Sequence, residues 1–436
     1  MLKSEINFRE LNYIYFKDVV YLKEQDHGFI YCFVRFVVSF IASIVRLRFF
    51  YKKVNDIVFL VPTLNNKKTL KPIYEKIDGN KISIIDKYCK FFPQALIFIY
   101  SLAHFQTSFK FYLSCSAEER RIIRYYFYIF FTTIGTYIVF DKFLRKNRNI
   151  KIIVFANDHI MQNTCLIRLC KKYNIRTVYT QHASVTEDFP NLRFDYSFLD
   201  GKESLLKYKK SGKLEGMVFL SGSPRFDAIS QIKKNKVNLD VIGIALNQLD
   251  SIQEAHRLCE FLLSKGYNHI IIRPHPGMLP IFKSAIKTFT DIGVKVSDPI
   301  KELSFSYLSR LNLLIANESG IHLDAVLMGV KSVLYNLNPK SKILDWYSFV
   351  KSGLIPIAYS FEELIHYLSL EQFHVDEEKA RFFNSAYATN YQGKVGNLIA
   401  DFINSLIISE EDAKAYIDNV FLKEDDYYVY KVHTHE

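Results

Sequence analysis

The sequence lacks the motifs of several common protein classes. Its six cysteines form no C-x-x-C pair and have no histidine at zinc-finger spacing, so neither a disulfide scaffold nor a structural metal site is predicted. It contains no G-x-G-x-x-G and no G-x-x-x-x-G-K-[ST], which argues against a classical dinucleotide enzyme or a P-loop NTPase. Residues 1–26 are charged throughout, with no apolar core before a cleavage site. We therefore expect no secretory signal, a reducing cytoplasmic location and no cofactor.

What is present is a long, basic and largely apolar chain. Its 436 residues are 49% hydrophobic, and this length argues for two domains. The 57 Lys and Arg exceed the 45 Asp and Glu and give a formal charge of +12, which favours nucleotide diphosphates, lipid phosphates or acidic membranes as partners. Charge alone would also allow nucleic acid, which we do not expect as a partner.

Two segments near the start combine apolar, aromatic and basic residues. The stretch from Phe29 to Val45 contains Arg35 and is followed by four basic residues, so it is short and impure for a membrane span. A second such segment runs from Arg120 to Arg148. Buried helices with basic rims explain both patterns, and the alternative is peripheral contact with the inner face of the cytoplasmic membrane.

Apolar runs of strand length alternate with amphipathic runs of helical length, which predicts an α/β fold with parallel sheets. The predicted strands are Ile57–Val61, Ile82–Ile85, Ile152–Ala156, Thr177–Thr180, Tyr196–Leu199, Met217–Leu220, Val241–Ala245, His269–Arg273, Val294–Ser297, Leu313–Ala316 and Ser332–Tyr335. A polar connector, Gln231–Asn238, separates two Rossmann-like doubly wound domains, 1–230 and 239–436, and the last helices could pack back on the first. We expect the two domains to face a cleft.

In open α/β sheets ligands bind beyond the carboxyl ends of the strands, and His182 lies there, directly after the strand Thr177–Thr180. An acceptor hydroxyl must lose its proton as it attacks, and histidine titrates nearest to neutral pH. His182 is therefore the candidate base. The alternative is a structural histidine bonded to a loop carbonyl.

A second candidate site follows the strand His269–Arg273. Two prolines fix the turn that carries Arg273 and His275. The arginine fork suits a diphosphate, and a protonated His275 could add a hydrogen bond to the same leaving group. A rigid surface turn with a solvated arginine is the alternative.

A third candidate site follows the strand Leu313–Ala316. Small residues at the start of the helix Ile321–Met328 expose amides at Ser319 and Gly320, which suit a phosphate, while Glu318 could accept from a ribose or sugar hydroxyl. Simple capping of the helix by Ser319 is the alternative.

Weaker candidates follow the strand Ile152–Ala156. Asn157, Asp158 and His159 could contact an acceptor, although a helix cap explains Asn157 or Asp158 equally well. The acidic clusters near the carboxyl terminus, 410–412 and 424–426, are interpreted as solvated faces, and we expect no metal site.

These motifs, in their order, resemble those of the CDP-glycerol glycerophosphotransferase (teichoic acid polymerase) group and of related capsule and lipopolysaccharide glycosyltransferases with a GT-B fold. The shared positions are His182, the set Gly222, Pro224, Arg225 and Asp227, then His275 with Pro276, and Ser319. The resemblance covers roughly residues 152–337. It departs from the group at Ala183 and Ser184, where glycine and threonine are usual, and at 317–320, which replace an acidic-aromatic double-serine turn.

The resemblance implies an enzyme that transfers a sugar or polyol unit from a nucleotide-activated donor to a lipid-linked or glycan acceptor, by metal-independent inverting displacement. His182 would be the base, Arg273, His275 and Ser319 would hold the donor phosphates, and Arg225 would serve the nucleotide or the hinge. The related transferases that use CMP-activated sugars make a cytidine donor the preferred expectation. Two rival hypotheses are a UDP-N-acetylglucosamine 2-epimerase-like enzyme and a non-catalytic partner of a glycan-assembly machine.

Overall fold

The chain divides into two compact units, called unit 1 and unit 2 below. The computed structural model describes residues 6–17, 28–44, 51–231, 241–369 and 375–431. Unit 1 comprises Met1–Asp200, Ser204–Arg225 and Gly396–Glu436, and unit 2 comprises Gly201–Glu203 and Phe226–Val395. The expected second domain, 239–436, therefore ends earlier than predicted, because its last segment belongs to unit 1. Most of the predicted connector, from Ile232 onward, lies outside the described residues.

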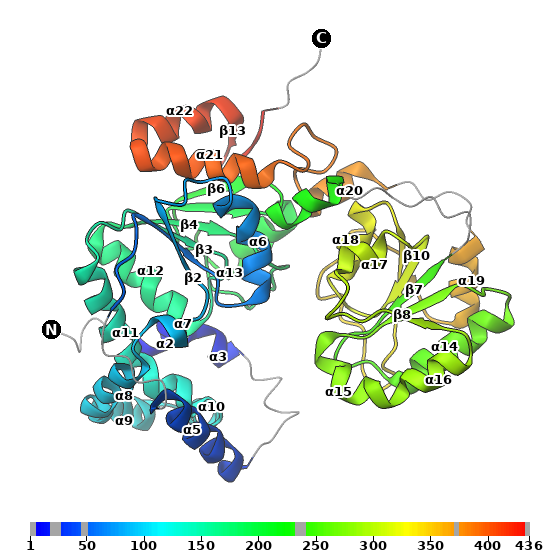
Figure 1. Ribbon diagram of the computed structural model, residues 1–436, viewed down its shortest axis with the longest axis horizontal. Coiled ribbons are helices and arrows are strands. Elements are labelled where there is room, and N and C mark those ends of the chain that lie inside the picture. The colour runs from blue at the N-terminus through cyan, green and yellow to red at the C-terminus, as the bar shows by residue number, and fades with distance from the viewer. Residues whose placement is uncertain (1–5, 18–27, 45–50, 232–240, 370–374, 432–436) are drawn as a thin grey trace. The chain divides into compact units, whose positions relative to one another are not determined.

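Unit 1 is built on an eight-stranded sheet in the order β13-β14-β6-β5-β4-β3-β1-β2 (Figure 1). Its first six strands are β1 (Ile57–Leu60), β2 (Ile82–Ile85), β3 (Ile152–Phe155), β4 (Arg176–Thr180), β5 (Tyr196–Leu199) and β6 (Met217–Leu220). They pair in parallel, and Val154 of β3 lies opposite Phe59 on one side and Val178 on the other. All six strand predictions are confirmed to within one residue at each end, because buried parallel strands read as near-continuous apolar runs, and even the partly exposed edge strand β2 is apolar at three of its four positions.

Two strands at the carboxyl terminus complete this sheet. β13 (Phe421–Glu424) and β14 (Tyr427–Tyr430) form an antiparallel hairpin, and Tyr428 of β14 lies opposite Phe219 of β6 in parallel register. The helices α21 (Val395–Ile408) and α22 (Glu410–Val420) precede the hairpin. The cluster 410–412 lies on an exposed face as predicted, and Glu410 there also pairs with Arg176 at 2.5 Å and accepts from Tyr196 at 2.7 Å.

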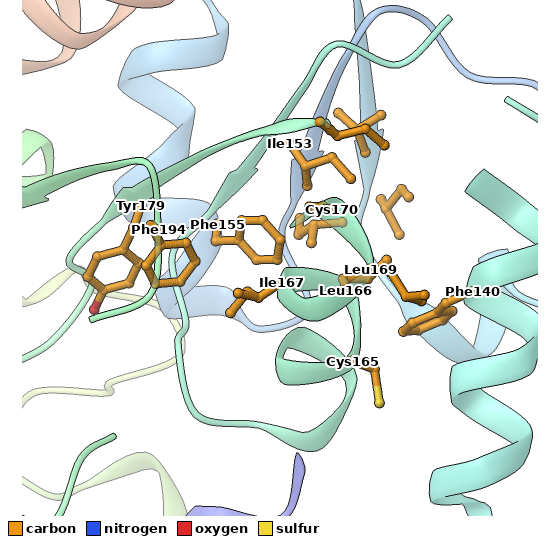
Figure 2. Close-up of a cluster of buried hydrophobic side chains, with 14 of the residues drawn as sticks. Phe140, Ile153, Phe155, Cys165, Leu166, Ile167, Leu169, Cys170, Tyr179 and Phe194 are labelled. Atoms are coloured by element: carbon orange, nitrogen blue, oxygen red, sulfur yellow. The ribbon is translucent and has the colours of Figure 1, made fainter. Parts of the chain in front are cut away.

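The strand order of unit 1 reverses between β1 and β3. The chain leaves β1 for β2 on one side and resumes at β3 on the other, so loops diverge at the carboxyl ends of β1 and β3. The helices around the sheet are α6 (Leu64–Tyr74), α12 (Met161–Tyr173) and α13 (Lys202–Ser211). Figure 2 shows Leu166, Leu169 and Cys170 of α12 packed near Ile153 and Phe155 of β3, within the core that positions these loops.

The rest of unit 1 is a helical region formed by the amino-terminal part of the chain. It contains α2 (Phe8–Leu11), α3 (Tyr13–Lys17), α5 (Phe29–Ile44), α7 (Tyr88–Phe91), α8 (Gln94–Ala103), α9 (Phe105–Ser114), α10 (Ala117–Tyr125) and α11 (Phe127–Lys146). Ser116 and Glu119 form a capping box at the start of α10. Among the described helices, α11 alone is long and apolar enough to cross a membrane, but 72% of its apolar window is buried within the unit, as expected of a core helix.

Unit 2 is built on a six-stranded parallel sheet in the order β12-β11-β10-β7-β8-β9. Its strands are β7 (Ile242–Ala245), β8 (Ile270–Arg273), β9 (Lys295–Val296), β10 (Leu313–Ala316), β11 (Lys331–Tyr335) and β12 (Ile357–Ala358). Its α-helices are α14 (Ile252–Ser264), α15 (Leu279–Phe282), α16 (Ile286–Asp291), α17 (Ser304–Leu308), α18 (Ile321–Leu327), α19 (Phe361–Ser369) and α20 (Glu377–Phe383). The order reverses between β7 and β10, so this unit also is doubly wound.

Candidate functional sites at the strand ends

A histidine and a carboxylate form a close pair at the carboxyl end of β3. Nδ1 of His159 lies 2.8 Å from Oδ1 of Asp158. The Asn157 amide nitrogen lies 3.1 Å from Nε2 of the same ring. With Nδ1–H donated to the carboxylate, Nε2 is the unprotonated nitrogen of the neutral ring and accepts from the amide. The pair therefore holds His159 in one tautomer and one orientation.

Asp158 is buried and is held by one further group, the Tyr208 hydroxyl. Its other oxygen accepts from the Tyr208 hydroxyl at 2.6 Å, and the Tyr208 hydroxyl lies 3.0 Å from that of Tyr179. Burial alone would raise the pKa of Asp158, but the hydrogen bonds from His159 and Tyr208 outweigh it, so this pKa is lowered. The carboxylate is thus ionised at neutral pH and can stabilise a positive charge on His159.

His182 lies beside this pair, as the strand order places β4 next to β3. The centroids of the His159 and His182 rings are 6.4 Å apart. Burial lowers the pKa of His182 to about 4, and the nearby Arg225 and His159 act in the same direction against the attraction of Asp158. His182 is therefore neutral at physiological pH, and it is a weaker proton acceptor than an unperturbed histidine.

The neighbouring residues shape this edge of unit 1. The Asn157 side chain accepts from the backbone N–H groups of His159 and Ile160, so it caps a turn rather than α12, whose N-cap is Ile160. Phe189 packs on the His159 ring with centroids 4.5 Å apart. The structure thus brings together His182 and the three residues that the sequence offered only as weak acceptor contacts.

The carboxyl ends of β7 and β10 in unit 2 carry a network of amides and carboxylates. Asp250 accepts from the Asn247 N–H at 2.7 Å and from the Asn317 amide at 2.8 Å. The Asn247 amide donates in turn to the Glu318 carbonyl at 3.4 Å. Burial raises the pKa of Asp250 to about 6, although both hydrogen bonds favour its ionised form. This network fixes the loops on both sides of the point where the strand order reverses.

Glu318 has a different environment from the one expected for a ligand of ribose or sugar. Its carboxylate accepts from the backbone N–H groups of Leu344 at 3.0 Å and Trp346 at 2.7 Å. These bonds anchor a distant loop, a partner that nothing in the local sequence signals. The prediction that Glu318 binds a hydroxyl is therefore not supported by its contacts.

The phosphate-binding site expected at the start of α18 is only partly formed. Helix α18 begins at Ile321 and has seven residues, and its N-cap is Gly320 with no side-chain hydrogen bond. The interpretation of Ser319 as the helix cap is therefore wrong, although its Oγ accepts from the Ile321 N–H at 3.4 Å. Nothing lies within 4 Å of the position that a Cβ on Gly320 would occupy, so this turn is open on that side.

Arg273 faces the interior of unit 2 instead of an open loop. Its guanidinium donates to Ser297 Oγ at 2.6 Å and to the Glu302 carbonyl at 2.8 Å, and it lies over the Tyr307 ring at 5.4 Å. With 8% of the residue exposed, its donors hold β8 to the segment after β9. This placement contradicts the solvated arginine considered from the sequence, whereas the role of Arg273 as a phosphate ligand stays a prediction.

His275 remains exposed at the end of the same strand. Its Nδ1 accepts from the Gly277 N–H at 3.0 Å, which leaves the proton of the neutral ring on Nε2. Burial of part of the ring lowers the pKa of His275. Gly277 in turn lies against Gln248, because a Cβ at Gly277 would come within 1.9 Å of the Gln248 amide nitrogen. The loops after β7, β8 and β10 are therefore neighbours along one edge.

The comparisons with known proteins concern the fold. No protein-family model matches this sequence, and no curated protein matches it. A UDP-N-acetylglucosamine 2-epimerase structure matches with a TM-score of 0.51 and 12% identity, over 82% of this chain and 97% of that one. A co-structure of S. aureus MnaA with UDP matches at 0.50 and 12%, over 81% and 97%. The wall teichoic acid polymerase TagF matches at 0.48 and 12%, over 89% and 98%.

The fold is GT-B. At this level of identity the likeness extends to the arrangement of the chain and no further. The predicted α/β fold class of GT-B type is confirmed, and the resemblance stated from the sequence is confirmed for the fold alone.

Proposed function

We propose that this GT-B protein transfers a sugar or polyol unit from a nucleotide-activated donor to a hydroxyl of a bacterial surface glycan. The observation that carries the proposal is the Asp158–His159 pair beside His182, at the carboxyl edge of the unit 1 sheet. A hydroxyl that attacks an activated centre must lose a proton, and a neutral imidazole oriented by a buried carboxylate is built to accept it. The direct transfer inverts the reacting centre.

Within this pair of histidines, His159 is the better placed proton acceptor. Asp158 would stabilise its charged form, whereas burial opposes a charge on His182. We therefore revise the assignment of His182 as sole base: His159 takes the proton at Nε2, and His182 and Asn157 position the acceptor. Asn157 must turn its amide away from Nε2 as the acceptor hydroxyl replaces it.

The donor half of the proposal rests on unit 2. The strand order reverses between β7 and β10, where open α/β sheets bind ligands, and the loops there are fixed by the Asp250–Asn317 network. The exposed His275 and the amides at Ser319 and Gly320 are the groups proposed to meet the donor phosphates. Arg273 supports this edge from within, and Arg225 supplies positive charge near His182.

The membrane is the proposed location of the acceptor. Helix α5 packs Phe36 against Phe127 and Phe40 against Phe98, with ring centroids 5.0 and 5.1 Å apart, and turns its other face outward. The exposed apolar residues on α5, α8 and α9, neighbours in Figure 1, are Ile30, Phe33, Val34, Val38, Ile41, Ile99, Leu102, Phe105, Phe109 and Leu113. Exposed Arg35, Lys110 and Arg124 accompany this apolar face and would attract anionic lipid.

The test of the transferase proposal combines binding with turnover. The purified protein is heated with CMP, CDP, UDP, GDP and their sugar or polyol conjugates, and a nucleotide that binds the folded state raises the midpoint of unfolding. The stabilising donor is then incubated with and without lipid-linked glycan acceptors, and nucleotide release is measured. Release that depends on the acceptor supports the proposal, with a cytidine donor as the preferred outcome.

The rival functions give different results in the same experiment. Conversion of UDP-N-acetylglucosamine with no acceptor present would establish an epimerase. Binding without turnover, together with an unimpaired biological function of His159→Gln and His182→Ala, would establish a non-catalytic partner. Failure of every nucleotide to bind would refute the transferase proposal.

The membrane part is tested separately, with vesicles. Sedimentation with anionic vesicles should fall strongly in Val38→Glu, which places a charge in the apolar face. The matched control is Ile281→Glu, since Ile281 is similarly exposed but belongs to α15 of unit 2. Equal binding by both variants would show that the face on α5 does not contact lipid.

A further inference from the structure

The loop after β11 holds an exposed tryptophan in a fixed position. Trp346 is the sole tryptophan of the chain, and 48% of it is exposed. Its neighbour Tyr347 stacks on the buried Phe349 with ring centroids 5.4 Å apart, which ties the loop to the core of unit 2. Exposure of a large apolar side chain to water is unfavourable. Specific contacts hold this loop in its conformation.

Two carboxylates build this loop from its backbone. The Glu318 carboxylate accepts from the N–H groups of Leu344 and Trp346, one on each oxygen. The Asp345 carboxylate accepts from Val350 at 3.2 Å and Lys351 at 2.8 Å. Charge-assisted bonds of this kind are stronger than neutral ones, so the tip of the loop is held from both sides.

The backbone around Trp346 is also in an unusual conformation. Asp345 has φ 51° and Ser348 has φ 59°, and both are left-handed positions that side chains other than glycine rarely adopt. The unfavourable conformations flank the dipeptide Trp346–Tyr347. Such conformations persist where the surrounding contacts impose them, and here those contacts fix the backbone of a tryptophan that is 48% exposed.

The loop that carries Trp346 is anchored at the expected ligand-binding edge of unit 2. Glu318 follows β10, and its carbonyl accepts from Asn247, which follows β7. The residue that anchors Trp346 therefore lies at the reversal of strand order in unit 2, where ligands of such sheets bind. Every nucleobase has a π-face, and stacking on an aromatic side chain does not require a particular base.

We infer that the Trp346 indole is the stacking surface for the nucleobase of a nucleotide bound to unit 2, and that Glu318 positions it by holding its backbone. This inference rests on the proposed nucleotide donor and assigns the part of the site that recognises its base. Leu344 is also exposed and is bound to the same carboxylate through its backbone N–H, but it has no aromatic ring and is not part of the stacking surface.

A fluorescence titration tests the inference directly, because selective excitation of tryptophan reports on Trp346 alone. CMP, CDP and UDP should each quench the emission of the full-length protein in a saturable way, whereas inorganic pyrophosphate, which has no base, should not. In calorimetric titrations Trp346→Ala should bind these nucleotides about 5- to 150-fold more weakly, and Trp346→Phe should recover part of the loss. Leu344→Ala is the matched control and should weaken binding far less.

The outcomes separate this inference from the proposed function. Nucleotide binding that leaves the emission unchanged and survives Trp346→Ala would overturn the inference and leave the donor proposal standing. Equal quenching by pyrophosphate and CDP would also overturn it, since the loop would then respond to phosphate alone. Absence of nucleotide binding to the wild-type protein in calorimetry would refute both.

Discussion

The two units share a doubly wound sheet topology but differ in the side chains that follow their central strands. Each has a doubly wound sheet with polar residues after the two strands where the order reverses. In unit 1 these residues are an imidazole, a buried carboxylate and a second imidazole nearby, which can exchange a proton. In unit 2 they are amides and carboxylates that bind one another and the backbone. The comparison teaches that the edge of unit 1 carries groups that are able to exchange a proton, whereas the edge of unit 2 carries groups that hold loops in place.

The largest expected effect concerns the histidine pair. His159→Gln and Asp158→Asn should lower turnover by about 10²- to 10⁴-fold, because the proton acceptor or its stabilising charge is lost. Nucleotide-induced stabilisation should be unchanged, since the donor is proposed to bind unit 2. His269→Gln, an exposed histidine outside both clusters, should leave turnover intact. Normal turnover of His159→Gln would show that His159 does not accept the proton, and the proposed difference between the two units would then be wrong.

A second effect concerns the assembly of unit 1 from separated segments. Phe402 of α21 is fully buried against Tyr196 and Phe198 of β5, so Phe402→Ala should lower the free energy of unfolding of unit 1 by about 3–5 kcal/mol. The control Phe282→Ala, equally buried, should weaken unit 2 instead. Calorimetry combined with limited proteolysis would assign each transition. If Phe402→Ala destabilised unit 2 instead of unit 1, the assignment of α21 to unit 1 would be wrong.

Acidification should weaken unit 1 through His182. Its pKa of about 4 lies below its unfolded value of 6.5, so its stabilisation is complete above pH 6.5 and is lost as pH falls toward 4. The loss amounts to at most about 3 kcal/mol. His182→Gln should flatten the dependence of the free energy of unfolding on pH in this window. An unchanged slope in urea unfolding would show that His182 titrates normally.

The opposite sign is expected at Asp250 in unit 2. Its pKa of about 6 lies above its unfolded value of 3.8, so stability is greatest below pH 3.8 and is lost as pH rises through 6, by at most about 3 kcal/mol. The buried His322, whose pKa is lowered to about 4, opposes this trend within the same unit. Comparison of the wild type with Asp250→Asn isolates the carboxyl group. If the difference between them does not change from pH 4 to pH 6, Asp250 is not shifted.

The sequence predicted the elements better than their contacts. Continuous apolar runs identified ten of the strands closely, whereas the expected strand Val294–Ser297 shrinks to the two residues of β9. The short β12 and the hairpin β13–β14 were missed. In the hairpin, the charged residues 423–426 separate a two-residue apolar start from the strand YYVY, and its pairing with β6 joins segments about two hundred residues apart. Local periodicity carries no signal for such a pairing.

In the candidate sites too, the positions of residues could be predicted from the local sequence, but their side-chain partners could not. Positions after the strands were predicted correctly for His182, Asp158 and His159, because a strand end is a local feature. The partners were not predictable, since Ser297 for Arg273 and Trp346 for Glu318 lie far along the sequence. Two residues expected to bind a ligand thus turned out to bind the protein itself.

The carboxyl-terminal hairpin also determines the order in which the molecule can form during synthesis. Unit 2 is almost a continuous segment, while the sheet of unit 1 lacks β13 and β14 until the end of this sequence has left the ribosome. Domains usually fold in the order of their synthesis, and here the later unit can be finished first. Until then β6 is an unpaired edge strand that can pair with another chain. We therefore expect the nascent protein to be prone to misassembly during this interval and to benefit from chaperones.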